Sequence, residues 1–93
     1  MDYWLLLVDL DGVLWDHLDI SILDPPFRRV SSMKIIDSNG VEVNLNRDIL
    51  EYIKWCRDRG AITSTLSWNI YWKALEALRA FRVVDLFDYL MIE

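Results

Sequence analysis

The feature that most constrains the fold is an apolar run, Trp4 to Val8, which two aspartates follow at once. Five apolar residues with no polar alternation predict a strand covered on both faces, as in the parallel sheet of an α/β protein. Because side chains alternate along a strand, Asp9 and Asp11 should leave the chain on the same side, where ligands of such sheets bind. Two carboxylates this close call for a divalent cation, so the sequence predicts a ligand or metal site at this strand end.

The rest of the chain alternates between helical and strand patterns. We predict a helix over 47–59, a strand over 61–66, a second helix over 69–81 and a third strand over 89–92. This βαβαβ order implies a parallel sheet with right-handed crossovers.

Local signals fix the ends and inner faces of the two helices. Asn46 is a candidate N-cap of the first helix, Gly60 is a stop signal after it, and Cys56 falls on its core face with Ile49 and Ile53. The second helix should bury an apolar stripe made of Tyr71, Ala74, Leu75, Leu78 and Phe81.

Composition limits the classes of partner. The chain of 93 residues is expected to form one domain, 1–93, and its net charge is −5. Its ten basic residues are scattered, which argues against nucleic acid as the main partner, since phosphate attraction needs a clustered basic face. No apolar run approaches the ~18 residues of a membrane span. The amino terminus lacks the positive charge and apolar length of a targeting sequence, and the single cysteine excludes an internal disulfide, so we expect a cytoplasmic protein.

The segment Asp9-Leu10-Asp11-Gly12-Val13-Leu14 resembles the first motif of the haloacid dehalogenase-like (HAD) phosphohydrolases. The resemblance implies that Asp9 attacks phosphorus to form an aspartyl phosphate, that Asp11 is the general acid/base, and that both help to hold Mg²⁺. This is sensible chemistry, because a carboxylate can carry a phosphoryl group and a second acid must handle the leaving-group proton. A simpler interpretation of Asp9, Asp11 and Gly12 is turn geometry alone.

Further segments resemble the magnesium-dependent phosphatase-1 branch of that family. They are Leu14-Trp15, the block Asp24-Pro25-Pro26-Phe27 and a hairpin-like stretch, 35–43, centred on Ser38-Asn39-Gly40. This implies a HAD-like three-layer sandwich with a parallel sheet, truncated after the third strand, and a hairpin flap at about 31–45 in place of a cap. The proline pair equally fits a rigid loop.

Ser67 follows the second predicted strand, where the family's second motif has a Ser or Thr that binds the transferred phosphoryl group. A helix start just after it would favour an anion there, and Asn69 could assist. The alternative is that Ser67 is only the N-cap of the second helix.

The family's third-motif lysine and fourth-motif acidic pair have no counterpart here. Lys73 lies too close to Ser67 to match, and Glu93 cannot replace the pair. The first strand would then be an exposed apolar edge, a feature that favours self-association. The leading hypothesis is a Mg²⁺-dependent phosphomonoester hydrolase acting on small-molecule or protein-borne phosphates, such as sugar phosphates or phosphotyrosine. The alternative is an inactive, truncated HAD half-domain that binds a partner or is a remnant.

Overall fold

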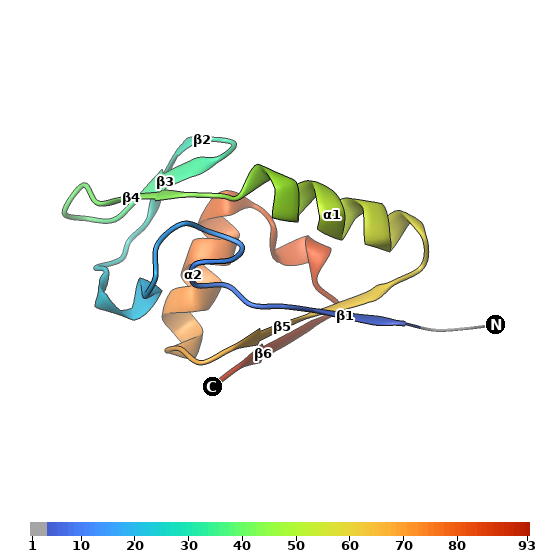
Figure 1. The fold of residues 1–93 in the computed structure, drawn as a ribbon. Coiled ribbons are helices and arrows are strands. Elements are labelled where there is room, and N and C mark those ends of the chain that lie inside the picture. Colours follow the sequence, from blue (N-terminus) through green and yellow to red (C-terminus); the bar gives the residue numbers. More distant parts are fainter. Residues whose placement is uncertain (1–3) are drawn as a thin grey trace.

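A parallel sheet of three strands forms the base of the computed structural model, which describes residues 4–93 (Figure 1). The strands β1 (Leu5–Val8), β5 (Ile62–Ser67) and β6 (Tyr89–Ile92) lie in the order β1-β5-β6. Both pairs are parallel, with Val8 opposite Thr65. The predicted mixed α/β fold with a parallel sheet is thereby confirmed.

A second, antiparallel sheet is formed by the part of the chain that runs from β1 to the first helix. It consists of β2 (Arg28–Ser31), β3 (Lys34–Ile36) and β4 (Glu42–Asn44), in that order. The hairpin expected over 35–43 is present as β3 and β4, but the sequence did not predict β2 as a third strand. The carboxylate of Asp37 shapes the turn by accepting main-chain N–H bonds from Asn39 at 2.9 Å and Val41 at 2.8 Å.

The first helix, α1 (Arg47–Asp58), begins where the capping signal predicted. Asn46 Oδ1 accepts hydrogen bonds from the N–H groups of Asp48 (3.1 Å) and Ile49 (3.3 Å). Gly60 follows the helix with a positive φ of 88°, the conformation that favours glycine after a helix end. Cys56 is fully buried, as expected of a core thiol.

The second helix, α2 (Tyr71–Phe81), starts two residues later than predicted, and its predicted buried stripe is wrong at Tyr71. Ile70 is its N-cap, which excludes the alternative interpretation of Ser67 as only an N-cap, because Ser67 is the last residue of β5. Tyr71 is exposed, and Ala77 takes part in the buried stripe instead. Two short 3₁₀ turns, η1 (Ile20–Ile22) and η2 (Val84–Leu86), complete the described elements.

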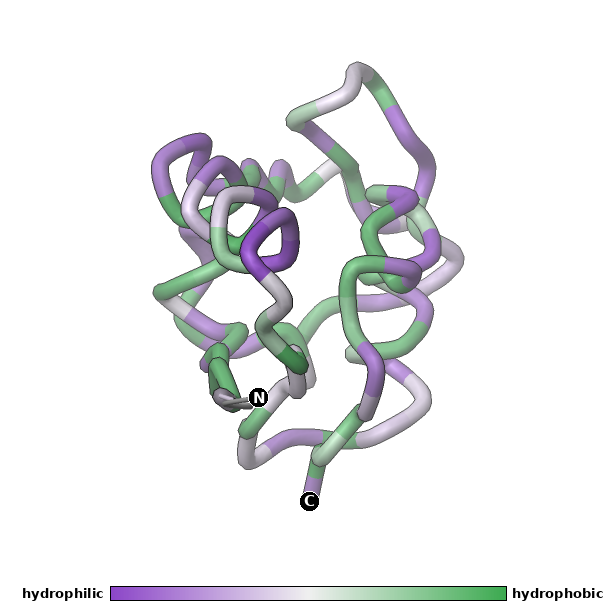
Figure 2. The backbone as a smooth tube through the Cα atoms, turned by 90° about the vertical axis from the view of Figure 1, so that its right-hand side faces the viewer, coloured by the Kyte–Doolittle hydropathy of each residue, from purple (hydrophilic) through white to green (hydrophobic). Residues whose placement is uncertain are grey.

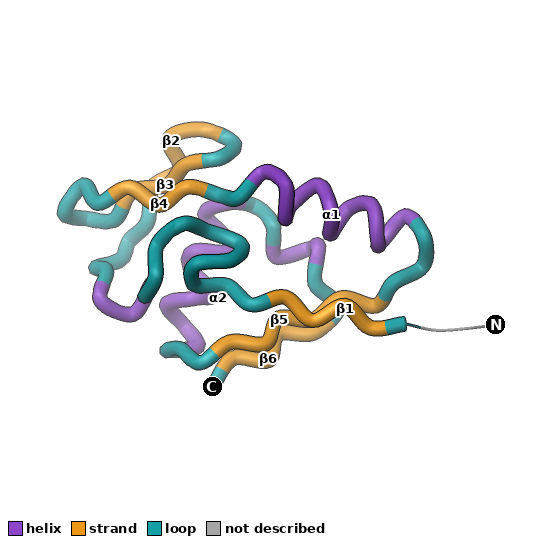
Figure 3. The backbone as a smooth tube through the Cα atoms, in the orientation of Figure 1, coloured by secondary structure: helices purple, strands orange, loops and turns teal. Residues whose placement is uncertain are grey.

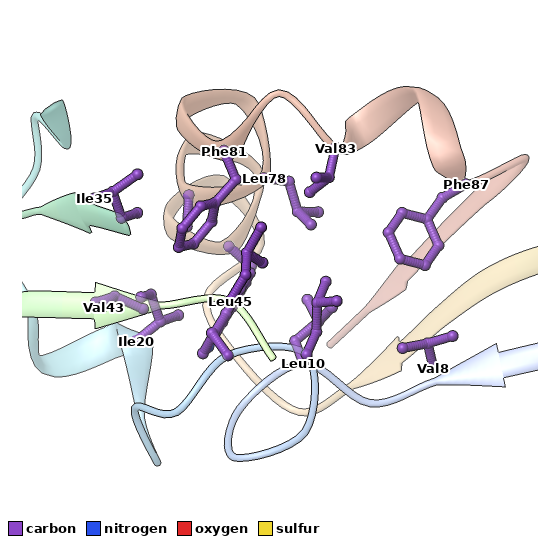
Figure 4. Close-up of a cluster of buried hydrophobic side chains, with 14 of the residues drawn as sticks. Val8, Leu10, Ile20, Ile35, Val43, Leu45, Leu78, Phe81, Val83 and Phe87 are labelled. Carbon is purple, nitrogen blue, oxygen red and sulfur yellow. The ribbon is translucent and has the colours of Figure 1, made fainter. Parts of the chain in front are cut away.

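One apolar core joins the two sheets through α2 (Figure 4). Ile35 and Val43 of the antiparallel sheet lie on one side of the helix residues Leu78 and Phe81, and Val8 of β1 lies on the other. Burial of this area supplies most of the favourable free energy of folding in a small domain.

The first strand is wrongly predicted to be covered on both faces. Leu5 and Leu7 are 57% and 47% exposed, whereas Val8 on the opposite face is buried. Both helices lie on the same side of the sheet (Figures 1 and 3), so the three layers expected of a HAD-like sandwich are not formed within residues 4–93. The bare face also carries Leu66, Tyr89 and Met91.

The two outer strands of the parallel sheet, β1 and β6, consist of apolar residues and one tyrosine. In Figure 2 the strand that leads to the C mark is drawn largely in the hydrophobic colour. Within residues 4–93, no helix combines the length and hydrophobicity that a membrane crossing requires.

An ion pair fastens α1 to the loop before β6. Arg57 Nη1 lies 3.1 Å from Asp88 Oδ2 and also donates to Leu86 O at 2.9 Å. The same carboxylate oxygen accepts the main-chain N–H of Thr63 at 2.8 Å. The hydrogen bond from Thr63 N, together with the charge of Arg57, holds the pKa of Asp88 below its usual value.

Acid should therefore weaken the fold through Asp88. Since the pKa of its carboxyl is lower in the folded state, its contribution is complete above about pH 4, the unfolded value, and is lost as the pH falls further. We expect Asp88→Asn to unfold more readily at neutral pH and to lose less stability on acidification than the wild type. Urea titrations at pH 7 and pH 3 measure both effects. Asp85→Asn, an exposed neighbour, is the control, and equal pH dependence in wild type and Asp88→Asn would contradict the assignment.

Candidate functional site

Asp9 lies at the carboxyl end of β1, one residue beyond its last paired position. The residue is exposed, and its Oδ1 accepts a hydrogen bond from the following main-chain N–H of Leu10 at 2.8 Å. Among residues 4–93, no hydrogen bond holds its Oδ2. Asp9 therefore presents a carboxylate oxygen that is free to act as a nucleophile or as a metal ligand.

Asp11 is the most firmly held carboxylate at this end of the sheet. Its Oδ1 accepts the indole N–H of Trp15 at 2.9 Å and the main-chain N–H of Ile20 at 3.1 Å. Its Oδ2 accepts the side-chain amide of Asn69. Donors from three parts of the chain thus fix the position of this side chain, whereas Asp9, two residues earlier, is exposed and accepts only the N–H of Leu10 within residues 4–93.

Asn69 reaches Asp11 from the junction between β5 and α2. Its Oδ1 accepts the N–H of Ile70 at 2.6 Å, and this bond turns the Nδ2 group towards Asp11. Asn69 was expected to help bind phosphate, and in the structure its side-chain amide donates to the Asp11 carboxylate instead.

Ser67 is the last residue of β5 and lies at the same sheet end as Asp9. Continuing the register beyond the pair Val8 and Thr65 sets Ser67 across from Leu10. The residue is largely buried, yet no fully buried polar side-chain atom within residues 4–93 lacks a partner. Since no hydrogen bond holds Ser67 Oγ there, this hydroxyl must reach the surface and can donate to a ligand.

The loop after β1 folds tightly around these groups. The carbonyl of Leu10 accepts N–H bonds from Val13, Leu14 and Trp15 at 3.1, 3.0 and 3.3 Å. Gly12 has a positive φ of 72°, and a Cβ there would lie 3.0 Å from a methyl carbon of Leu18, so the turn requires glycine. Turn geometry therefore explains the glycine at position 12. It does not explain why an exposed aspartate stands at position 9.

Lys73 supports the site from α2 without entering it. Its Nζ donates to the carbonyls of Ser21 (2.6 Å) and Leu23 (2.9 Å) in and after η1, the turn whose Ile20 N–H caps Asp11. This agrees with the sequence argument that Lys73 does not match a phosphate-facing lysine.

The antiparallel sheet is tied to the same loop. Asp16 accepts the main-chain and side-chain N–H groups of Asn44 at 2.8 and 2.9 Å. Beside this contact lies a shallow hollow of about 300 Å³ lined by residues that include Gly12, Trp15 and Asn46. Asp9 is itself exposed, so the site is open rather than enclosed.

The donors at this end suit a hydrated Mg²⁺ better than a caged one. Mg²⁺ is commonly held by one or two carboxylates with waters and substrate phosphate. The free oxygen of Asp9 and the main-chain carbonyl of Asp11 are donors of that kind, because both Asp11 side-chain oxygens are already engaged. Within residues 4–93, no three His, Cys, Asp or Glu side chains gather to form a complete metal cage.

Sequence reasoning missed the role of Trp15. Its ring is fully buried and stacked on Phe81, with centroids 6.1 Å apart, and its indole N–H donates to Asp11. The spacing of four residues between Asp11 and Trp15 was the available signal. Comparison of the sequence with models of protein families and with curated proteins found no match.

Proposed function

We propose that this protein is a Mg²⁺-dependent phosphomonoester hydrolase that works through an aspartyl phosphate on Asp9. The observation that carries the proposal is the contrast between the two acids at the end of β1. Asp9 is exposed with one oxygen free, while Asp11 beside it is held by Trp15, Ile20 and Asn69. A reactive carboxylate next to a positioned one is what a covalent phosphoryl transfer needs. The HAD-like resemblance of the same residues points to the same reaction.

In the first step, the free oxygen of Asp9 attacks phosphorus and the bond to the ester oxygen breaks. The leaving oxygen takes a proton from Asp11. This proton can reside on Oδ2 when the amide of Asn69 turns away, since that oxygen has a single donor. In the second step Asp11 accepts a proton from water, which attacks phosphorus, releases inorganic phosphate and restores the Asp9 carboxylate.

The remaining groups bind and balance charge. Ser67 Oγ can donate to a phosphoryl oxygen from the end of β5. Bound between Asp9 and the Asp11 carbonyl, Mg²⁺ would offset the charge on the phosphoryl oxygens. Because only these two protein donors are available there within residues 4–93, we expect weak Mg²⁺ binding and slow turnover.

The exposure of Asp9 bears on the substrate. Within residues 4–93, the segment between β1 and α1 contains a 3₁₀ turn and the three antiparallel strands but no α-helix that could form a helical lid. An open site accepts bulky esters, so phosphotyrosine and sugar phosphates are both candidate substrates. We assign the activity to the cytoplasm, where the thiol of Cys56 stays reduced.

The direct test is release of phosphate from p-nitrophenyl phosphate by the purified chain. We expect turnover in millimolar Mg²⁺ and none in EDTA, with activity restored when Mg²⁺ is added in excess. Absence of Mg²⁺-dependent turnover over a range of enzyme concentrations would contradict the enzyme proposal.

A second candidate function, partner binding, is favoured by the edge of the parallel sheet. Ile62 N donates to Trp4 O, so the alternation along β1 turns the N–H and C=O groups of Leu5 and Leu7 outwards. Charged residues or prolines usually protect an edge strand from pairing with another chain. Residues 4–8 contain neither. A second copy related by a two-fold axis can pair with this edge in antiparallel fashion.

Self-association is tested by light scattering after size-exclusion chromatography. We expect the wild type to form dimers as its concentration rises, and Leu7→Lys to remain monomeric because it places a charge on the edge strand. Val30→Lys, a similarly exposed position on β2, is the matched control. A wild-type chain that is monomeric at every concentration would refute the edge pairing.

A further inference from the structure

A groove of about 290 Å³ lies between the antiparallel sheet, α1 and the end of α2. Four basic residues line it, from three places in the fold: Arg29 in β2, Arg47 and Lys54 on α1, and Arg82 just after α2. Glu51 is the one acidic residue on its wall. A chain with a net charge of −5 therefore concentrates positive charge at one place.

These four cations are not engaged by the protein itself. The ion pairs within residues 4–93 are Lys34 with Glu42 and Arg57 with Asp88, and neither involves the groove. No side-chain hydrogen bond within the same part of the chain uses Arg29, Arg47, Lys54 or Arg82 as a donor. Like charges brought together without partners repel one another, and an anion bound among them would relieve that repulsion.

Arg82 occupies a backbone conformation that rarely suits it. It ends α2 with φ 60° and ψ 39°, the left-handed region in which glycine or asparagine is usual. Its side chain is thereby carried to the groove wall. An arginine with this unfavourable backbone conformation thus stands in the lining of the groove.

The floor of the groove is apolar. Met33 and Leu50 are partly exposed there, with Phe81 and Val83 buried beneath. Guanidinium groups bind phosphate and phosphonate oxygens through paired hydrogen bonds, and small-molecule sites typically combine an apolar lining with a few such polar groups. The geometry points to a binding site for an amphiphilic anion: a phosphate-type group held by the basic rim, with an apolar body lying on Met33 and Leu50.

This site is separate from the one at Asp9. Asn69 lies just before α2 and Arg82 just after it, so the two ends are about 16 Å apart along an 11-residue helix. Figure 1 shows the end of β1 and the start of α2 at the parallel sheet, while the end of α2 lies by the antiparallel sheet. The inference therefore does not depend on the phosphatase proposal.

Phenylphosphonate is a suitable probe, because it has a dianionic head, an aromatic body and a carbon–phosphorus bond that an aspartyl-phosphate enzyme does not cleave. We expect calorimetry at low salt to show one binding event that Arg82→Gly weakens about tenfold, the loss of one charge-assisted contact. Glycine suits the left-handed position, so this variant should melt no lower than the wild type. Arg29→Gln should weaken binding by a similar factor.

Matched controls are available on the same elements. Arg79→Gln on α2 and Arg28→Gln on β2 remove equal charge from exposed residues outside the groove, and both should bind the probe almost as the wild type does. Inorganic phosphate should bind several-fold more weakly than phenylphosphonate, because it lacks the apolar body.

Two results would rule out an anion site in this groove. One is equal binding by wild type, Arg82→Gly and Arg29→Gln. The other is loss of binding in Asp9→Asn with retention in Arg82→Gly, since the probe would then occupy the Asp9 site alone. If inorganic phosphate bound as tightly as phenylphosphonate, the assignment of an amphiphilic ligand would be wrong.

Discussion

Asp9→Asn is expected to abolish Mg²⁺-dependent phosphate release, with a loss of at least about 10³-fold, because an amide oxygen is a poor nucleophile and no other free carboxylate replaces it at the end of β1. The change is nearly isosteric and the side chain is exposed, so the fold should be unaffected. Initial rates with p-nitrophenyl phosphate, measured alongside the thermal midpoint, separate the two effects.

The matched control for that prediction is Asp85→Asn, which makes the same chemical change at another exposed aspartate, in η2. It should retain full activity. Acid-quenched wild-type enzyme should also carry phosphate in a bond that hydroxylamine cleaves, as an acyl phosphate requires, and Asp9→Asn should carry none. Turnover by Asp9→Asn close to the wild-type rate would remove Asp9 from the reaction.

Trp15→Ala is expected to cause the largest loss of stability, about 3–5 kcal/mol in the free energy of unfolding. The ring is fully buried and stacked on Phe81, and its removal leaves a cavity at the centre of the core. A domain of this size has about 5–10 kcal/mol in total, so the variant should be close to unfolding. Urea denaturation followed by far-UV circular dichroism measures the loss.

Trp15→Phe separates packing from hydrogen bonding. It keeps an aromatic ring but removes the N–H that Asp11 accepts at 2.9 Å, for a smaller loss of about 1–3 kcal/mol. Because Asp11 would then lose one of its donors, turnover should fall by more than the loss of folded protein explains. A Trp15→Phe variant with wild-type turnover would mean that the indole N–H serves the fold alone.

Local signals in the sequence were enough to locate most elements. Asn46 and Gly60 marked the ends of α1, and the strand predicted over 89–92 agrees with β6. The exposure of one face of β1 could not be predicted from such local signals. An unbroken apolar run shows that both faces of a strand are able to be buried, but burial depends on neighbours elsewhere in the fold, and Leu5 and Leu7 lack them.

In the candidate site, too, local features could be predicted and contacts that depend on the path of the chain could not. Asp9 and Asp11 are neighbours in sequence, and their shared strand end follows from strand geometry. The path of the next loop decides whether Trp15 reaches Asp11, and the start of α2 decides where Asn69 points. The four-residue spacing of Asp11 and Trp15 allows the first contact but does not fix it, and the second contact joins residues 58 positions apart. The basic groove was hidden for a similar reason, since its four cations are spread from Arg29 to Arg82.

The bond between Asp11 and Asn69 has a consequence for how the site comes into being during folding. It joins residues 58 positions apart, with the antiparallel sheet, α1 and all of β5 in between. Contacts of such long range form only after the intervening chain has been ordered, because the entropy of closing that loop must first be overcome. The arrangement around Asp11 is thus a late product of folding, and recovery of activity during refolding should lag behind recovery of helical signal.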